Sequence, residues 1–203
     1  MRLVALLLAL VLGVAATPRG SRYLHETLTA NGDVYRYSVY VPSTYRAGLP
    51  LLVMIHGCRA TDDREAAATG YDALAERKRF VVLYPDVDAA DIAAGRCWKG
   101  LWHPQGEARG RGDAKAIAAM TRAVISAWHV DPSRVYAIGM SSGAFETSIL
   151  GADYPDVYAA IGIHSGAAGW QPDGLQQRLL PACRVGIADA KPLSKPRFRD
   201  DAE

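Results

Sequence analysis

Continuous apolar runs recur along this chain between polar segments that are rich in turn-forming residues. Runs of this kind at residues 51–55, 80–85, 134–138 and 157–163 have the length of β-strands. A strand that is apolar throughout is typical of a parallel sheet, where helices cover both faces. We therefore expect these four runs to form buried strands.

The segment 35–41 has a different pattern, because its side chains alternate and are rich in β-forming types. This alternation predicts an edge strand or an early strand of the sheet. Asn31-Gly32-Asp33, directly before it, is typical of a hairpin turn. We expect the hairpin to pair this strand with residues 23–28.

Helical patterns fill the gaps between the apolar runs. Asp62 or Asp63 can cap a short helix that extends through residues 74–78, and Asp113 opens a longer helix. Residues 144–153 also have helical character. The longer helix has one apolar face, made of Ile117, Met120, Val124, Ile125 and Trp128. The alternation of buried strands and helices predicts a doubly wound α/β sheet.

One pentapeptide, Gly139-Met140-Ser141-Ser142-Gly143, lies between a predicted strand and a predicted helix. A strand that turns abruptly into a helix at a serine is typical of a nucleophile elbow. Gly139 and Gly143 remove side chains where the strand and the helix crowd together. Ser141 would then present its hydroxyl clear of the sheet. The amide of Ser142, at the start of the helix, would face an oxyanion that forms beside it.

Composition and charge exclude several other classes of protein. The 203 residues are half apolar, which is enough for one globular domain with a core, and the net charge of +2 gives no case for a nucleic-acid partner. The sequence has no zinc-ligand spacing, phosphate-binding loop, heptad array or internal repeat. We expect no cofactor and no metal ion.

The N-terminus has the pattern of a targeting segment. Arg2 precedes an uncharged apolar run, residues 3–16, that is too short to span a bilayer in the usual way. Small residues then lead into Thr17-Pro18, as in a cleavable signal peptide. We expect residues 1–16 to be removed and the protein to be secreted, without a stable membrane anchor. A retained N-terminal anchor is the alternative.

Several stretches, in a fixed order along the chain, carry a resemblance to a known family. They are residues 52–58, 81–85, 97–98, 130–136, 139–143 and 154–160. From about Tyr37 to Gly166 the chain resembles the polyhydroxybutyrate depolymerase and feruloyl esterase group of secreted α/β-hydrolases. The resemblance implies an α/β-hydrolase-type, mostly parallel sheet. It also implies hydrolysis of carboxylic esters, polymeric ones included, through an acyl-enzyme on Ser141.

The resemblance also implies roles for residues around Ser141. It places the second oxyanion amide in the loop after the strand 51–55, at Cys58, beside the amide of Ser142. His56 is then not the catalytic histidine, because the triad order in this fold is serine, acid, histidine.

The three cysteines are Cys58, Cys97 and Cys183, in a chain that we expect to be exported to an oxidising compartment. In the register of the family, Cys58 and Cys97 lie at the ends of adjacent strands, so the resemblance implies a disulfide between them. That bond would hold the oxyanion loop and bring Trp98 toward the substrate pocket. Trp98 and Trp102 could equally belong to the core.

The sequence departs from the family after the serine. Only 62 residues follow Ser141, whereas the family supplies its acid and its histidine from loops well downstream. We interpret His164, the only histidine among them, as structural, and we assign the acid to Asp189, which lies in a motif similar to that of the family. We expect a C-terminally truncated hydrolase domain over residues 17–183 that lacks the last strands and helices of the fold, followed by a disordered tail, 184–203.

Three functions remain open from the sequence. The first is a secreted serine esterase, and the second is a catalytically impaired remnant that keeps the elbow without the triad histidine. The third is a secreted module that binds an aromatic or polymeric ester through the loop of Trp98 and Trp102. An acyltransferase is a variant of the first, because an alcohol competes with water for the same acyl-enzyme. The oligomeric state is not predicted.

Overall fold

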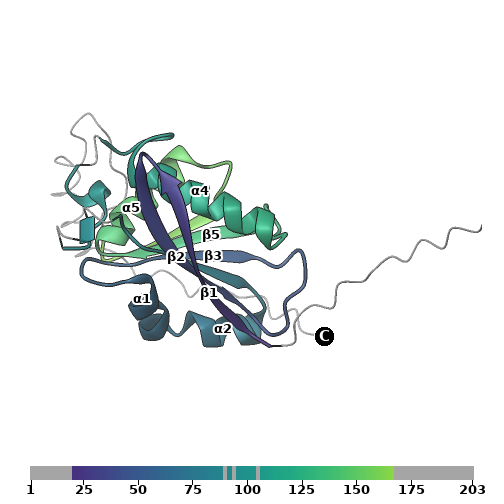
Figure 1. Cartoon of the computed structure of the whole chain (residues 1–203). Coiled ribbons are helices and arrows are strands. Elements are labelled where there is room, and N and C mark those ends of the chain that lie inside the picture. Colours follow the sequence, from purple (N-terminus) through teal and green to yellow (C-terminus); the bar gives the residue numbers. More distant parts are fainter. Residues whose placement is uncertain (1–19, 89–90, 93–94, 104–105, 167–203) are drawn as a thin grey trace, which may run out of the picture.

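A computed structural model describes residues 20–88, 91–92, 95–103 and 106–166 (Figure 1). Its six strands are β1 Arg22–Ala30, β2 Asp33–Val41, β3 Leu51–Ile55, β4 Val81–Pro85, β5 Val135–Met140 and β6 Ala160–His164. Its helices are α1 Asp62–Thr69, α2 Tyr71–Lys78, the short 3₁₀ helix η1 Lys99–Leu101, α4 Gly112–Ala127 and α5 Ser142–Asp153. None of the helices in these ranges is both long enough and apolar enough to cross a membrane.

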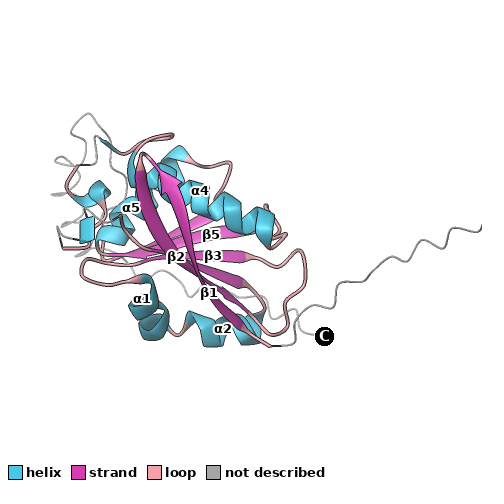
Figure 2. Ribbon diagram, viewed as in Figure 1, coloured by secondary structure: helices cyan, strands magenta, loops and turns pink. Residues whose placement is uncertain are grey.

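The strands form one mixed sheet in the order β1-β2-β4-β3-β5-β6 (Figure 2). The hairpin of β1 and β2 is antiparallel, and β2 also pairs antiparallel with β4. The remaining pairs, β3 with β4, β3 with β5 and β5 with β6, are parallel. The predicted hairpin and the mostly parallel α/β sheet are both confirmed.

Helices cover both faces of the sheet (Figure 1). Helices α1 and α2 lie on one face against β4, and α4 and α5 pack on the opposite face. Strand β4 shows the result, because Leu83 belongs to the core beneath α4 and α5 whereas Val82 and Tyr84 belong to the core beneath α1 and α2. Covering both faces explains why this strand is apolar at every position.

The first predicted helix is two helices in the structure. Gly70 separates α1 from α2 and adopts the left-handed conformation, with φ 66°, that glycine accepts at no steric cost. The N-cap of α1 is Thr61, whose hydroxyl accepts a 3.1 Å hydrogen bond from the amide of Arg64, so neither Asp62 nor Asp63 is the cap. Asp62 is instead buried within the first turn.

The last predicted strand starts later than its apolar run. Residues 154–158 form a turn, because the amides of Val157 and Tyr158 both donate to the carbonyl oxygen of Tyr154. Strand β6 therefore spans Ala160–His164 and pairs only with β5 among the described residues. As the edge of the described sheet it is partly exposed, so the expectation of a fully buried strand was wrong.

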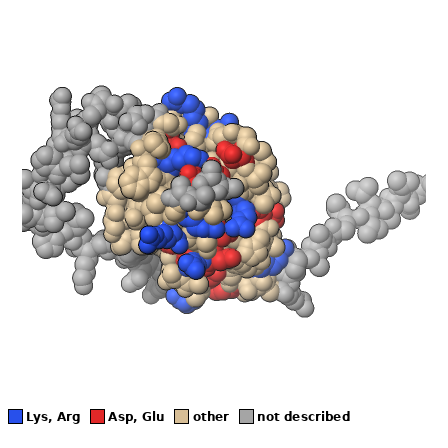
Figure 3. All heavy atoms as spheres, turned by 60° about the vertical axis from the view of Figure 1, so that its left-hand side comes forward, with Lys and Arg blue, Asp and Glu red and all other residues tan. Residues whose placement is uncertain are grey.

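Basic and acidic side chains lie next to one another on the face drawn in Figure 3. This mixture is in keeping with the small net charge of +2. Several predictions fall outside the described residues: the signal peptide 1–16, the tail 184–203, Cys183 and Asp189.

Candidate active site

Ser141 lies at the sharp turn between β5 and α5. Its backbone has φ 53° and ψ −119°, a conformation that non-glycine residues rarely adopt, and its side chain is exposed. Such backbone strain persists only where the surrounding structure holds it, and it is common at functional sites. The predicted strand–serine–helix turn is therefore present, with the hydroxyl open to solvent at the carboxyl end of β5.

The glycines around Ser141 allow three segments to meet. A Cβ atom on Gly139 would clash with the carbonyl group of Gly143, and a Cβ atom on Gly143 would clash with the carbonyl group of Ile55. A Cβ atom on Gly57 would lie 3.3 Å from the Cβ of Ser141, so the loop after β3 lies directly against the elbow. The close approach that the glycines of the pentapeptide predict is present.

Two backbone amides near Ser141 are free among the described residues. Ser142 is the first residue of α5, so its amide has no acceptor within the helix. In the loop after β3, the amide of Arg59 donates to Gly95 and that of Ala60 donates to Gly57, whereas the amide of Cys58 has no acceptor in the described part of the chain. These bonds hold the loop in place and leave the Cys58 amide available.

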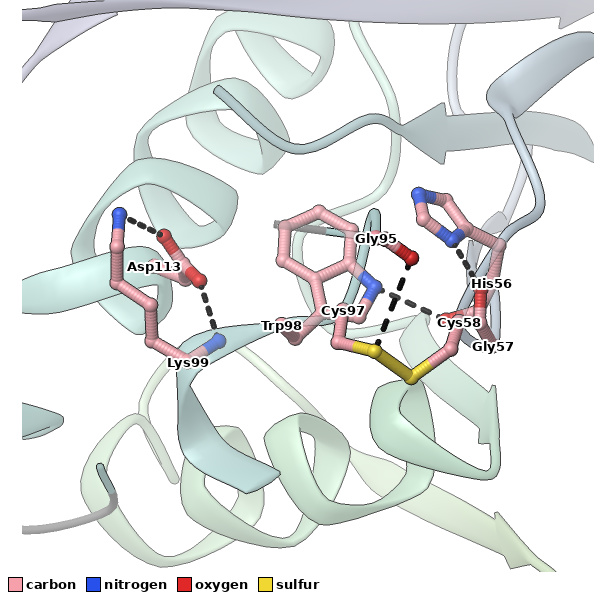
Figure 4. The surroundings of a disulfide bond; sticks show 8 residues. All are labelled: His56, Gly57, Cys58, Gly95, Cys97, Trp98, Lys99 and Asp113. Carbon is pink, nitrogen blue, oxygen red and sulfur yellow. Dashed lines mark hydrogen bonds and ion pairs between the residues drawn. A yellow bond between two sulfur atoms is a disulfide. The ribbon is translucent and has the colours of Figure 1, made fainter. Parts of the chain in front are cut away.

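A disulfide joins Cys58 to Cys97, as the resemblance implied (Figure 4). The two Cα atoms are 4.3 Å apart, and the cysteines are 39 positions apart in the sequence. The amide of Arg59 also donates to the carbonyl oxygen of Gly95 at 3.1 Å, so the loop after β3 has two attachments to the segment 95–97. The disulfide therefore ties the loop that carries the free Cys58 amide to the segment that precedes η1.

Trp98 follows Cys97, and its side chain has no exposed surface. Its indole nitrogen donates a 2.9 Å hydrogen bond to the carbonyl oxygen of His56, and the two rings lie 5.1 Å apart (Figure 4). Of the two alternatives for Trp98, the structure favours the core, so its assignment to the substrate pocket is corrected. The buried indole instead holds the start of the loop after β3 through its hydrogen bond to His56. Trp102, in contrast, is 64% exposed.

Both ring nitrogens of His56 have partners other than Ser141. Its Nδ1 lies 2.7 Å from the carbonyl oxygen of Gly57, and its Nε2 lies 3.2 Å from the Oδ1 of Asp86. Arg96 holds the same carboxylate at 2.7 Å. Burial opposes ionisation of Asp86, but the hydrogen bond and charge of His56 and the charge of Arg96 outweigh it and lower its pKa. This buried cluster joins β3, the end of β4 and the segment before Cys97.

No histidine ring contacts the hydroxyl of Ser141 in the described ranges. The carbonyl oxygen of His164 accepts a 3.0 Å hydrogen bond from the amide of Ser141, whereas the imidazole Nδ1 lies 3.3 Å from the hydroxyl of Ser165. The described residues thus bring together Ser141 and two candidate oxyanion amides without a general base. The predicted acid, Asp189, is not among them.

Within the described part of the chain, two groups of side chains have metal-ligand chemistry. In the first, the ammonium group of Lys99 already occupies the centre, at 2.6, 2.9 and 3.4 Å from oxygens of Asp88, Asp91 and Asp113 (Figure 4 shows Lys99 and Asp113). The second group joins His25 to the carboxylates of α1's first turn, Asp62 and Asp63. There, Ser38 donates to Asp62 at 2.6 Å and Tyr23 donates to Asp63 at 3.0 Å. Protein donors already bind both carboxylates of this second group.

Sequence reasoning missed a further buried group, the carboxyl side chains of Glu107 and Glu146. Glu146 belongs to α5, one turn beyond Ser141, and has no exposed surface. Burial first, and the charge of Glu107 second, raise the pKa of Glu146 well above its usual range. The only signal for Glu146 in the sequence is an acid near the start of a helix of mostly apolar and small residues, and that pattern is also typical of a solvated position.

A family model described as "Esterase PHB depolymerase" matches residues 35–171. A poly(3-hydroxyalkanoate) depolymerase C of Paucimonas lemoignei is 38% identical over 121 residues, which are 59% of this chain and 28% of that protein. A feruloyl esterase B of Neurospora crassa is 31% identical over 166 residues, which are 81% of this chain and 51% of that protein. The chain thus spans about half or less of the length of these two relatives.

Solved structures show the same architecture. An acetyl xylan esterase from Aspergillus awamori is similar with a TM-score of 0.63 and 28% identity, over 71% of this chain and 53% of that one. A poly(3-hydroxybutyrate) depolymerase from Bordetella parapertussis has a TM-score of 0.52 at 18% identity, over 67% and 48% of the two chains. The second likeness concerns the fold alone.

Proposed function

This chain belongs to the esterase PHB depolymerase family, and on that premise we propose that it is a secreted serine esterase that cleaves carboxylic esters through an acyl-enzyme on Ser141. One observation carries the proposal: Ser141 is exposed at a strained turn, with φ 53°, at the start of α5. A structural serine has no need of this strain, whereas a nucleophile gains access to substrate from it.

The chemistry follows from this geometry. The Oγ of Ser141 attacks the ester carbonyl carbon, and the carbonyl oxygen becomes an oxyanion. The amides of Ser142 and Cys58 donate to that oxyanion, and each donor of this kind is worth about 10²–10³-fold in rate. The intermediate collapses as the alcohol leaves with the proton that the Ser141 hydroxyl gave up, and water then attacks the acyl-enzyme to release the carboxylic acid and restore the hydroxyl.

The attachments around Cys58 support its part in this proposal. An oxyanion amide is useful only when it is held in place before the reaction. The disulfide to Cys97 and the hydrogen bond from Trp98 to His56 hold the loop after β3 at two points. We assign Cys58 and Cys97 to pre-organisation of the oxyanion site, and Trp98 to support of the same loop.

The substrate class rests on the relatives and on one exposed side chain. The matched proteins are named as a poly(3-hydroxyalkanoate) depolymerase, acetylxylan esterases and a feruloyl esterase. We propose an ester substrate of these kinds, polymeric ones included. Trp102, which is 64% exposed on the segment after the disulfide, is suited to contact an apolar or aromatic part of it.

A second candidate, the catalytically impaired esterase, is favoured by the lack of any histidine ring at the Ser141 hydroxyl within the described ranges. General-base assistance is worth about 10²–10⁴-fold, so turnover without a base is slow. The proposed full site includes a histidine and an acid, and we keep Asp189 as the candidate acid.

Hydrolysis of p-nitrophenyl acetate tests the choice. We expect the purified chain to release p-nitrophenol and Ser141→Ala to fall to the rate in buffer. A burst of about one equivalent followed by slow release would identify the impaired form, because acylation then outpaces deacylation. Equal rates for the two proteins would reject Ser141 as the nucleophile. The ester-binding module would then remain, and saturable binding of an ester without cleavage would identify it.

A further inference from the structure

Glu146 is a buried carboxyl group in the helix of the proposed nucleophile. Its Oε2 accepts a 3.1 Å hydrogen bond from the amide of Gly100, in η1. Its Oε1 is buried and has no hydrogen-bond partner among the described residues. An ionised carboxylate in this position would leave that oxygen unsatisfied, at a substantial cost in free energy.

Glu107 is the closest acidic influence on Glu146: after burial, its charge is the largest cause that raises the pKa of the Glu146 carboxyl group, and both side chains are buried. Glu107 is 5% exposed, and its Oε2 accepts a 2.9 Å hydrogen bond from the amide of Ala114, in the first turn of α4. Two ionised carboxylates have no proton to donate to each other. Oε1 of Glu146 has no partner among the described residues, so it is the oxygen available to carry a proton and donate it to Glu107.

The charges around the pair do not neutralise it. Among the described residues, the cation near the pair is Lys99, and its ammonium group is already shared by Asp88, Asp91 and Asp113. Asp113 adds further negative charge beside both glutamates, and the remaining titratable neighbour, Tyr158, is a neutral phenol. Two buried like charges with no cation of their own cannot both persist.

We propose that Glu107 and Glu146 hold one proton between them, and that this acid–carboxylate pair positions the start of α5 against the segment 99–101. The proton, taken up from solvent, resides on the Oε1 of Glu146 and is donated to the carboxylate of Glu107. Burial, the largest cause for both groups, raises the pKa of Glu107 to about 7 and raises that of Glu146 well above its usual range, in agreement with a proton retained at neutral pH.

The pair connects the parts of the proposed active site, and in this respect the inference rests on the proposed function. Glu146 lies just beyond Ser141 in α5, and Gly100 lies three residues after Cys97, whose disulfide holds Cys58. A side chain on Gly100 would clash with the carboxyl group of Glu146, so the two segments are in direct contact. Glu146 and Glu107 are thus positioning residues for the nucleophile and the oxyanion loop.

The pH dependence of unfolding tests the shared proton directly. Because the pKa values are raised in the folded chain, the folded state holds a proton that the unfolded state releases above pH of about 4.5. Stability must therefore fall as pH rises, and each retained proton raises the unfolding constant about tenfold per pH unit. In Glu146→Gln the amide donates to Glu107 and its oxygen accepts from Gly100, so no proton is needed there.

Between pH 5 and 8, we expect the unfolding constant of Glu146→Gln to rise with pH less steeply than that of the parent chain, by about tenfold per pH unit. Glu26→Gln, at an exposed position on β1, should keep the slope of the parent chain. Glu107→Gln provides a second variant, because its amide can donate to an ionised Glu146 and should also reduce the slope. Infrared spectra should show a protonated carboxylic acid at pH 7.5 that Glu146→Gln lacks. Unchanged slopes in both variants, or no such band in the parent chain, would overturn the proposal.

Fluorophosphonate labelling of Ser141 tests the positioning role separately. We expect Glu146→Ala to label at least tenfold more slowly and Glu146→Gln to label within about twofold of the parent chain. Equal rates for Glu146→Ala would reject the positioning role. No labelling of any variant, with the pH slopes as expected, would reject the proposed function and leave the shared proton standing.

Discussion

The amide of Ser141 donates a 3.0 Å hydrogen bond to the carbonyl oxygen of His164. This bond joins the proposed nucleophile to the end of β6, and it involves only the backbone of His164. The imidazole has its own neighbour, the hydroxyl of Ser165, at 3.3 Å from Nδ1. The sequence alone does not distinguish two roles for His164, a general base and a backbone anchor. These contacts favour the backbone anchor.

Replacement of the His164 side chain should therefore have little effect on Ser141. We expect His164→Ala to react with a fluorophosphonate probe within about twofold of the parent rate, because alanine keeps the backbone carbonyl that Ser141 uses. The measurement is the rate of covalent labelling by mass spectrometry. A decrease of more than about tenfold would show that the imidazole is the base, and that our structural interpretation of it is wrong.

Gly143→Ala should disrupt the elbow, because its methyl group would clash with the carbonyl group of Ile55 in β3. Overpacking against backbone cannot be relieved by a side-chain rotation, so we expect a loss of about 3 kcal/mol or more in the free energy of unfolding. Urea denaturation measures it. Gly106→Ala is the matched control, since a Cβ there meets nothing within 4 Å, and it should stay within about 0.5 kcal/mol.

Removal of the disulfide should lower stability by about 3–4 kcal/mol in the chain-entropy model, because it closes a loop of 39 residues. Cys58→Ser combined with Cys97→Ser makes this change and should also slow labelling of Ser141, since the oxyanion loop loses one of its attachments. Cys183→Ser is the control and should change neither quantity. Peptide mapping without reduction would contradict the account if it found Cys58 joined to Cys183.

Asp86→Asn should destabilise the chain by about 3–5 kcal/mol, because it leaves the buried His56 and the partly buried Arg96 without their carboxylate. The pKa of Asp86 is lowered in the folded chain, so its contribution is present above pH of about 4 and is lost as pH falls below that value. Between pH 4 and 2 the parent should therefore lose stability more steeply than Asp86→Asn. Asp33→Asn, at an exposed position on β2, should behave like the parent.

Local pattern was sufficient for much of the fold. Strands β3 and β4 follow from apolar runs that are covered on both faces, and the hairpin follows from Asn31-Gly32. The elbow was predictable because its two glycines and its serine each have a local steric reason to be there. The boundary of β6 was not, because the turn at Tyr154 competes with an apolar run that continues through it.

The polar interior of the site could not be read from the sequence. The burial of Glu146 depends on Gly100, 46 residues earlier, and that of Trp98 depends on the carbonyl oxygen of His56, 42 residues earlier. Neither partner has a local sequence signal. Such contacts form only when the segment 95–101 folds back between β3 and α5, and this depends on the tertiary structure as a whole.

The most direct test of the central claim, that Ser141 is an activated nucleophile, is the site of fluorophosphonate attachment. In this reaction the Oγ of the serine displaces fluoride from phosphorus, and peptide mass spectrometry locates the adduct. We predict one adduct, on Ser141, in the native chain, and none in Ser141→Ala or in the urea-unfolded parent, where the strained elbow is lost. Equal labelling of the parent and Ser141→Ala, or an adduct on another serine, would contradict the claim.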